Sequence, residues 1–443
     1  MKIPVNYQGK KIAVLGAGES GEAAARLLAE EGAVVTILDS ADPEKLGAKA
    51  AKLAGTGISL VAGSAADNDP GRYDLGILSP GIDPSAPLVR HFLANHPGLL
   101  TGELELSYGF CKCPVIAITG TNGKTTTTQL VERMLNACGV RTAAAGNIGP
   151  AFAARVRESA GLDVMTLEVS SFQLETLGRF RPRIAAWLNL TPDHLDRYPG
   201  MKEYRDAKLR IFENQTPEDF AVVNLCDDLP PLLARKITFS AIRPGGDFEL
   251  RDGVIYHHDR AVFPVAETRL RGLHNAENLM AALGIGLAQG LAFEAMIPPL
   301  CSYTPLPHRC EPVRTVDGAE YINDSKATNL DALEKALASE SRPVVLIAGG
   351  KDKGFEFESI TDLVAEKARC AVLIGEMAER IRGCWGAKVR CEKAGSLAEA
   401  VATARRNARP GDAVLFSPGT SSFDMFINYA DRGNRFKALV NQL

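Results

Sequence analysis

The sequence has little net charge, and it lacks any long stretch without charged residues. The formal net charge is -3 in 443 residues, so the composition gives no reason to expect a nucleic-acid-binding surface. No segment stays uncharged for the roughly 18 residues that a membrane-spanning helix needs, and residues 1–9 contain no basic segment followed by an apolar run. We therefore expect a cytoplasmic protein that contacts neither nucleic acid nor membrane and whose partners are small molecules.

Cysteines in metal-site spacing are also missing. Of the nine cysteines only Cys111 and Cys113 lie close together, and no second pair follows at the spacing of a zinc site. An odd number of scattered cysteines is typical of a reducing compartment, in which thiols stay free. The apolar share of 46% and the charged share of 23% are ordinary for a globular protein.

The length of the chain indicates several domains. A single hydrophobic core rarely supports 443 residues, so about three domains of roughly 150 residues are expected. Short apolar runs alternate with amphipathic stretches, which is typical of parallel sheets covered by helices. We predict an α/β protein of three consecutive domains: a Rossmann-like N-terminal domain (1–109), a central P-loop ATPase-type domain (110–304) and a Rossmann-like C-terminal domain (305–443).

The expected elements follow this division. Strands are predicted at 11–15, 33–38, 58–62, 75–78, 114–119, 164–167, 184–188, 344–348, 371–374 and 413–416, and helices at 19–31, 124–138, 275–288, 330–338 and 397–407. Asp252-Gly253 between two apolar runs predicts a small antiparallel hairpin. The polar segment 101–109 marks the end of the first domain, and the five prolines within 298–312 disfavour regular structure near the end of the second.

The most informative segment is Gly120-Thr121-Asn122-Gly123-Lys124-Thr125, between an apolar run and a predicted helix. Such a loop binds phosphate because free backbone N–H groups and the positive end of the helix dipole meet there. Lys124 supplies a cation to the β and γ phosphates, and the Thr125 hydroxyl can ligate Mg²⁺. Residue 118 is isoleucine where the strict P-loop motif has glycine, so a plain glycine-rich turn is the alternative.

Polar side chains follow the next two predicted strands of the central domain. Glu168 ends one of them, and His194 lies just after the other. The carboxyl ends of parallel strands are where ligands bind, and both side chains suit a Mg²⁺ site or the orientation of a reacting carboxylate. Each residue taken alone is more often structural.

The first domain carries a second glycine motif, Gly-x-Gly-x-x-Gly at residues 16–21, directly after a strand. Asp39 follows the next strand about 20 residues later, and this arrangement is typical of an NAD site. The motif by itself does not choose between a dinucleotide and a UDP-sugar.

Taken together, the motifs resemble the Mur ligase superfamily, which builds the peptidoglycan stem peptide and includes folylpolyglutamate synthases. The resemblance rests on residues 120–125, 167–175 (LEVSSFQLE), 189–198 (NLTPDHLDRY), 274–278, 307–309 (PHR), 323–328 (NDSKAT) and 349–354 (GGKDKG). Residues 16–21, 79–82 and 417–424 with 432–433 are most similar to the branch of the superfamily that adds D-glutamate. The motifs are spread over nearly the whole chain.

The resemblance implies a ligase that uses ATP to phosphorylate the carboxylate of UDP-N-acetylmuramoyl-L-alanine. The amine of D-glutamate then attacks the acyl phosphate to give an amide. ATP and Mg²⁺, with two ions expected, are the implied cofactors, and the enzyme is expected to be a monomer. It also implies that Lys208 is N-carbamylated, whereas on residue type alone Lys208 is a solvated helix residue.

The resemblance further implies a role for each matching residue. Those implied in catalysis are Lys124, Glu168, His194 and Lys208. Those implied to hold metal are Thr125, Glu168, His194 and Lys208. The implied ATP contacts are Gly120, Thr121, Asn122, Gly123, Lys124, Thr125, Thr126, Asn278, Arg309 and Asp324. The implied contacts to the UDP substrate are Gly18, Ser20, Gly21, Asp39, Ser40, Ser79, Gly81, Asn147, Gln173 and His194. The implied D-glutamate contacts are Thr328, Lys353, Ser422 and Phe423.

Three alternatives stay open from the sequence. A related Mur ligase would add another amino acid, a dehydrogenase would bind NAD at residues 16–21, and a regulator would bind a nucleotide without catalysis. The dehydrogenase does not explain the phosphate loop of the second domain. The regulator does not explain Glu168, His194 and Lys208 occurring together.

Overall fold

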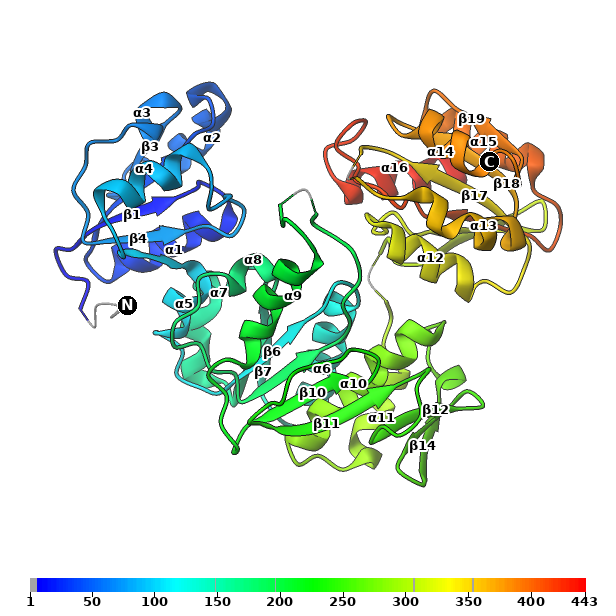
Figure 1. Cartoon of the computed structure of the whole chain (residues 1–443), viewed down its shortest axis with the longest axis horizontal. Coiled ribbons are helices and arrows are strands. Elements are labelled where there is room, and N and C mark those ends of the chain that lie inside the picture. The colour runs from blue at the N-terminus through cyan, green and yellow to red at the C-terminus, as the bar shows by residue number, and fades with distance from the viewer. Residues whose placement is uncertain (1–5, 148, 196, 306, 353) are drawn as a thin grey trace.

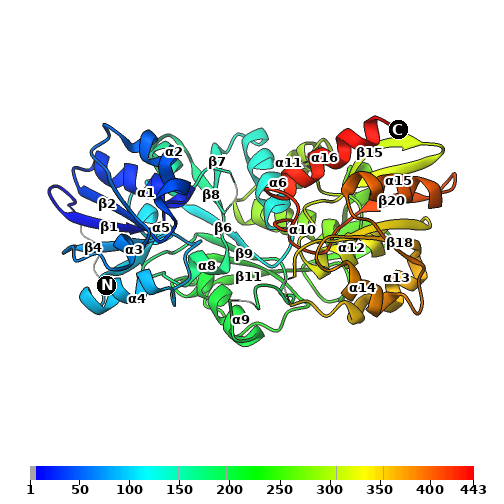
Figure 2. The same ribbon diagram turned by 90° about the horizontal axis from the view of Figure 1, so that it is seen from above.

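The computed structural model describes residues 6–147, 149–195, 197–305, 307–352 and 354–443, and there the chain forms α/β units in sequence order. Figure 1 shows the N-terminal unit (blue) and the C-terminal unit (yellow to red) on the same side of the central unit, and Figure 2 shows the units in a row. The predicted succession of α/β units is confirmed. No helix within the described ranges is both long and apolar enough to cross a membrane.

The N-terminal unit contains a parallel sheet with the strand order β3-β2-β1-β4-β5. Its strands are β1 (Lys11–Leu15), β2 (Val34–Asp39), β3 (Ser59–Ala62), β4 (Leu75–Leu78) and β5 (Leu100–Gly102). Its helices are α1 (Glu19–Glu30), α2 (Pro43–Leu53), α3 (Ser64–Asp67), α4 (Pro87–Asn95) and α5 (Glu103–Tyr108). The order reverses between β1 and β4, and ligands of such sheets bind beside that switch point.

The central unit contains a sheet with the order β14-β13-β12-β11-β10-β9-β6-β8-β7. Its strands are β6 (Val115–Thr119), β7 (Thr142–Gly146), β8 (Val164–Glu168), β9 (Ile184–Trp187), β10 (Phe220–Asn224), β11 (Arg235–Ser240), β12 (Phe248–Arg251), β13 (Val254–His257) and β14 (Arg260–Pro264). Its helices are α6 (Lys124–Ala137), α7 (Phe152–Arg155), α8 (Ser171–Leu174), α9 (Met201–Leu209), α10 (Leu273–Ala288) and α11 (Phe293–Cys301), with 3-10 turns η1 (Val156–Gly161), η2 (Arg210–Phe212) and η3 (Val265–Glu267). The predicted hairpin is β12–β13, which continues the sheet because β12 also pairs with β11.

Strand β6 lies inside this sheet, between β9 and β8, and the phosphate loop follows its carboxyl end. All five of its residues are buried, and alternate side chains enter different cores: Val115 and Ala117 one, Ile116 and Ile118 the other. A continuous apolar run is what a strand covered on both faces requires. Ile118 is in register with Glu168 of β8 and with Ala186 of β9, so the carboxyl ends of the three strands lie side by side.

The C-terminal unit contains a sheet with the order β15-β16-β20-β17-β18-β19, in which only β15 runs antiparallel to its described neighbour. Its strands are β15 (Glu311–Val316), β16 (Ala319–Asn323), β17 (Val344–Gly349), β18 (Ala368–Ile374), β19 (Cys391–Lys393) and β20 (Ala413–Phe416). Its helices are α12 (Leu330–Ser339), α13 (Thr361–Lys367), α14 (Ala378–Trp385), α15 (Leu397–Asn407) and α16 (Tyr429–Asn441), with the 3-10 turn η4 (Phe357–Ile360).

The three units are joined in different ways. One apolar core runs without a break from the N-terminal unit into the central one and includes Ile12, Val115 and Trp187. The two large cores of the C-terminal unit contain no buried residue from either of the other units within the described chain. Among the described residues, no shared apolar core therefore joins the C-terminal unit to the central one.

Residues 101–109, the polar segment at the predicted end of the first domain, are largely buried where the N-terminal and central units meet. Glu105 of α5 accepts hydrogen bonds from three consecutive backbone N–H groups at residues 178–180, at 3.0, 2.8 and 2.9 Å. Glu103 of the same helix accepts one from the backbone N–H of Ala153 at 2.6 Å. A buried carboxylate is stable when N–H groups donate hydrogen bonds to it. These donors lie many residues away from α5, so a local sequence pattern cannot predict them.

The expectation that residues 298–312 lack regular structure is wrong for their first residues. Pro298 and Pro299 lie inside α11, which is held by apolar side chains in the central core. A proline in a helix leaves the carbonyl four residues earlier without its N–H donor. The carbonyl of Ala295, four residues before Pro299, accepts a hydrogen bond from the Cys138 thiol at 3.3 Å instead.

Candidate active site

The phosphate loop (residues 120–125) connects β6 to α6 as predicted. Gly123 is the N-cap of α6 and has φ 84, in the left-handed region that favours glycine. A Cβ atom at this position would lie 2.3 Å from Oδ1 of Asn278, so α10 packs too closely on the loop for a side chain. The Lys124 ammonium donates to the carbonyls of Gly120 and Thr121 at 2.9 and 2.7 Å. It is therefore held at the loop itself.

Oxygen ligands for a metal lie beside the loop. The Thr125 hydroxyl donates to Oε2 of Glu168 at 2.9 Å, and the Asn147 amide donates to Oε1 of the same carboxylate at 2.7 Å. A hydroxyl next to a carboxylate suits Mg²⁺, which prefers oxygen ligands. No group of three or more His, Cys, Asp or Glu side chains in the described ranges is placed to hold an ion. The residues therefore fit a Mg²⁺ ion that takes its remaining ligands from phosphates and water.

Lys208 is buried in α9, contrary to what its residue type alone suggests. Its ammonium donates to the carbonyl of Gly120 at 2.9 Å and lies 4.7 Å from the ring centre of Tyr204. Burial and the nearby Lys124 hold the pKa of Lys208 well below its ordinary value, although Asp193 and Glu168 act in the other direction. Burial likewise lowers the pKa of Lys124. Two amines thus share the carbonyl of Gly120, and their charges oppose each other.

His194 follows β9 and sits in an unusual backbone conformation. Its φ is 57, which is uncommon for a residue with a side chain. Its N–H donates to Oδ1 of Asp193 at 2.9 Å, and its Nε2 lies 3.7 Å from Oδ2 of that carboxylate. The ring meets Phe172 edge-on, with centroids 4.8 Å apart. Asp193 thus contacts both the backbone and the ring of His194.

A cavity of about 280 Å³ lies between the central and C-terminal units and gathers most of the predicted ATP and metal residues. Its lining includes the predicted residues Thr121, Asn122, Gly123, Lys124, Thr125, Thr126, Asn147, Glu168, His194, Asn278, Arg309, Asp324 and Thr328. Gly120 and Lys208 are not among the lining residues, but they contact each other through the hydrogen bond from the Lys208 ammonium.

The C-terminal unit contributes Asp324 and Arg309 to the cavity. Burial raises the pKa of Asp324 to about 6, while hydrogen bonds from the Ser417 hydroxyl (2.8 Å) and the Cys310 N–H (3.1 Å) oppose this. Several other residues, for which the sequence implies no role, line the same cavity. These are Asp193, Arg269, Leu270, Arg271, His274, Asn275, Pro305, Cys310, Lys326, Ala327, Asn329, Ala332, Lys335, Ala336, Ser339 and Asn189. Several of them lie inside the quoted motifs, which were the available signal.

The predicted UDP-substrate residues of the N-terminal unit lie at the carboxyl ends of β1, β2 and β4. Asp39 accepts hydrogen bonds from the N–H groups of Ala17 and Ala41 at 2.6 and 2.8 Å, so its carboxylate braces the loop 16–21. A Cβ atom at Gly21 would lie 1.9 Å from the carbonyl oxygen of Gly16, which requires glycine there. The other predicted residues of this group are Gly18, Ser20, Ser40, Ser79 and Gly81, which share this end of the sheet.

The remaining predicted substrate residues are dispersed. Gln173 forms a capping box with Ser170 at the start of α8 and borders a small cavity with Arg197. Asn147 lines the interdomain cavity instead, next to Glu168. Among the predicted D-glutamate residues Ser422 is buried and Phe423 is exposed, in the segment that follows β20. Lys353 lies outside the described residues.

Comparison with known proteins identifies the family. The chain matches the Mur ligase middle domain over residues 118–286 and the Mur ligase glutamate ligase domain over residues 308–419. The UDP-N-acetylmuramoylalanine–D-glutamate ligase of Geobacter metallireducens is 41% identical over 449 residues, which cover 99% of each chain. That of Syntrophotalea carbinolica is 42% identical over 447 residues, which cover 99% of this chain and 98% of that protein. The chain belongs to this family of Mur ligases.

Solved Mur ligase structures share the fold at low sequence identity. The UDP-N-acetylmuramate-alanine ligase of Thermotoga maritima has a TM-score of 0.64 and 17% identity, and the match covers 98% of this chain and 99% of that one. A pseudomurein peptide ligase type C of Methanothermus fervidus has a TM-score of 0.60 and 18% identity, over 98% and 100% of the two chains. As a Mur ligase, this protein is a ligase that forms a carbon–nitrogen bond.

Proposed function

We propose that this Mur ligase joins D-glutamate to UDP-N-acetylmuramoyl-L-alanine in peptidoglycan precursor synthesis, with hydrolysis of ATP to ADP and phosphate. The observation that carries the proposal is the cavity between the central and C-terminal units. It combines a phosphate loop, the Lys124 ammonium, the Thr125–Glu168 pair and the Arg309 guanidinium on one surface. Full-length relatives bearing the D-glutamate ligase name support the choice of substrate.

In the proposed reaction a carboxylate oxygen of the UDP substrate attacks the γ-phosphorus of ATP, and the bond to ADP breaks. The amine nitrogen of D-glutamate then attacks the carbonyl carbon of the acyl phosphate. The bond to phosphate breaks and the nitrogen loses a proton. Two anions must meet in the first step, so the protein has to neutralise and position them. Lys124 and Arg309 supply the charge, Arg309 through a fork that pairs with phosphate oxygens.

Mg²⁺ would be held by the Thr125 hydroxyl and the Glu168 carboxylate, with His194 nearby. When bound, the ion offsets phosphate charge. The Asn147 amide fixes the orientation of Glu168 through its 2.7 Å hydrogen bond. The loop residues 120–126 and Asn278 would contact the nucleotide phosphates, and Asp324 the rest of the nucleotide.

Lys208 is proposed to carry a carbamate. Its amine is buried beside another amine, and this environment favours the neutral form, which can add CO₂ with loss of one proton. The carbamate would replace a positive charge with a carboxylate. A second Mg²⁺ would then have an anionic ligand next to the phosphate loop.

The other substrates are assigned to the flanking units. The loop 16–21 with Asp39, Ser40, Ser79 and Gly81 would bind the UDP portion at the switch point of the N-terminal sheet. Thr328, Ser422, Phe423 and Lys353 would bind D-glutamate. The protein is proposed to act as a cytoplasmic monomer.

A single assay tests the proposal. Purified protein is incubated with Mg-ATP, UDP-N-acetylmuramoyl-L-alanine and one amino acid at a time, and phosphate release and the amide product are measured. We expect both with D-glutamate only. Product with a different amino acid would keep the ligase class and overturn the substrate. Reduction of NAD without phosphate release would overturn the class.

A further inference from the structure

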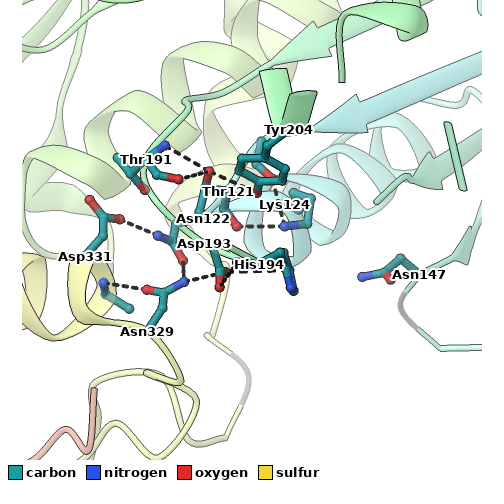
Figure 3. Close-up of polar contacts among 12 residues, drawn as sticks. Thr121, Asn122, Lys124, Asn147, Thr191, Asp193, His194, Tyr204, Asn329 and Asp331 are labelled. Atoms are coloured by element: carbon teal, nitrogen blue, oxygen red, sulfur yellow. Dashed lines mark hydrogen bonds and ion pairs between the residues drawn. The ribbon is translucent and has the colours of Figure 1, made fainter. Parts of the chain in front are cut away.

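Helix α12 of the C-terminal unit begins against the phosphate loop, and its N-cap residue, Asn329, reaches across the boundary. Oδ1 of Asn329 accepts a hydrogen bond from the N–H of Ala332, which caps the helix. Its Nδ2 donates to Oδ2 of Asp193 at 3.0 Å and to Oδ1 of Asn122 at 3.4 Å. Figure 3 shows Asn329 next to both partners. One buried side chain therefore holds its own helix and two segments of the central unit.

A second hydrogen bond, between Asn122 and Asp331, also connects the phosphate loop to α12. The Asn122 amide donates to the carboxylate of Asp331, in the first turn of the same helix, and Lys335 lies 3.0 Å from that carboxylate. The backbone N–H of Asn122 also donates to Oδ1 of Asn189 at 2.9 Å. The tip of the phosphate loop is thus fixed both to its own sheet and to α12.

The hydrogen bond from Asn329 to Asp193 is linked to His194 through the same carboxylate. Asp193 uses Oδ1 for the His194 N–H and Oδ2 for Asn329, so the two hydrogen bonds fix both oxygens of one buried carboxylate. His194 has φ 57, a conformation that costs energy unless its surroundings hold it. The C-terminal unit supplies one of the contacts that orient the carboxylate holding His194.

We propose that Asn329 is a positioning residue: when the C-terminal unit docks on the phosphate loop, Asn329 orients Asp193 and thereby keeps His194 in place for the reaction. The role of His194 in that reaction rests on the proposed function. Docking through Asn329 does not, because each contact from Asn329 to His194 joins two groups of the protein itself. Among the described residues no apolar core joins the C-terminal unit to the central one, and the contacts through Asn329 are polar.

The test variant is Asn329→Ser. Serine is as good an N-cap as asparagine, so α12 keeps its cap, but the shorter side chain cannot donate to Asp193. The control is Ser396→Ala, which removes the cap of α15 in the same unit; neither Ser396 nor any residue of α15 lines the cavity. If loss of helix stability were the cause of an effect, the control would show it more strongly than the test variant.

Two measurements decide the matter. In steady-state kinetics we expect kcat of Asn329→Ser to fall about tenfold to a hundredfold, as misplacement of a reacting group does, while KM for ATP changes less than about threefold. Ser396→Ala should keep kcat within about twofold. An unchanged kcat in Asn329→Ser, or an equal fall in both variants, overturns the proposal.

The second measurement is hydrogen exchange of the substrate-free full-length protein. Amides of residues 189–195 should exchange several-fold faster in Asn329→Ser than in the parent, and those of α15 should not. Equal exchange at 189–195 overturns docking through Asn329. If the parent protein forms no amide with D-glutamate, the proposed function fails, and the exchange experiment still tests the docking.

Discussion

Replacing Glu103 by glutamine should make the protein more stable at alkaline pH. Glu103 lies in α5 at the junction of the N-terminal and central units and is 1% exposed. Oε1 accepts hydrogen bonds from Ala153 N–H and the Ser107 hydroxyl, whereas Oε2 is buried without a partner among the described residues. Burial raises the pKa of this carboxyl to about 7. Glutamine has the shape of the protonated acid and carries no charge at any pH.

The size of the effect follows from the pKa. The folded protein binds the Glu103 proton more tightly than the unfolded chain, whose pKa is near 4.5, so the folded state holds more protons between these values. The free energy of unfolding therefore falls as the pH rises from about 4.5 to about 7, and the loss comes to about 3 kcal/mol. Glu103→Gln removes this loss, so the variant should gain on the parent by up to about 3 kcal/mol between pH 5 and pH 8.5.

Urea unfolding at several pH values, followed by tryptophan fluorescence, measures this gain. Trp187 lies in the core shared by the N-terminal and central units and reports on their unfolding. The matched control is Glu105→Gln, in the same helix, where the amide would turn a donor toward backbone N–H groups and cost about 2–4 kcal/mol at pH 7. A stability difference between Glu103→Gln and the parent that stays constant from pH 5 to pH 8.5 would refute the reasoning.

Three further predictions concern the site. Lys124→Ala should abolish phosphate release, because Lys124 is the cation held at the loop; turnover within tenfold of the parent would contradict this. Lys208→Ala should lose activity that short-chain carboxylic acids partly restore, while the control Lys202→Ala, at an exposed position of the same helix, should stay within about twofold. Absence of rescue would argue against the carbamate. Gly123→Ala should lower the free energy of unfolding by about 1–3 kcal/mol and reduce stabilisation by ATP in thermal unfolding, because the position is both left-handed and crowded. Gly139 has nearly the same φ, 83, but a Cβ atom there would have no described non-adjacent neighbour within 4 Å, so Gly139→Ala should keep the ATP response; equal loss in both would leave backbone strain as the cause.

The parts of the fold that local patterns control could be predicted from the sequence. The apolar run 115–119, the glycines after it and the helix from Lys124 form one continuous signal, and the structure reproduces it with a helix end at Ala137. Glu168 could be placed at the edge of the sheet because the carboxyl ends of parallel strands coincide.

Features that depend on distant partners could not be predicted from local pattern. Lysine on a helix is ordinarily solvated, and only the packing of α9 against the phosphate loop makes Lys208 a buried neighbour of Lys124. From the sequence Asn329 is an ordinary N-cap residue. Its contact with Asp193 could not be predicted, because Asp193 lies 136 residues away. Asp193 lies inside the motif 189–198, but its contact with Asn329 arises only when the units are assembled.

The N-terminal and central units share an apolar core, whereas the described cores of the C-terminal unit are separate, and this decides where the chain can be cut into fragments. The N-terminal and central units cannot be separated without exposing a common interior, so they should unfold as one cooperative block and be expressed only together. Buried core residues of the central unit extend to Tyr303, and the C-terminal cores involve residues from Cys310 onward. A cut between these two points would leave each fragment with a complete interior, so the C-terminal fragment is the natural unit for isotope labelling or for complementation by a separately produced partner.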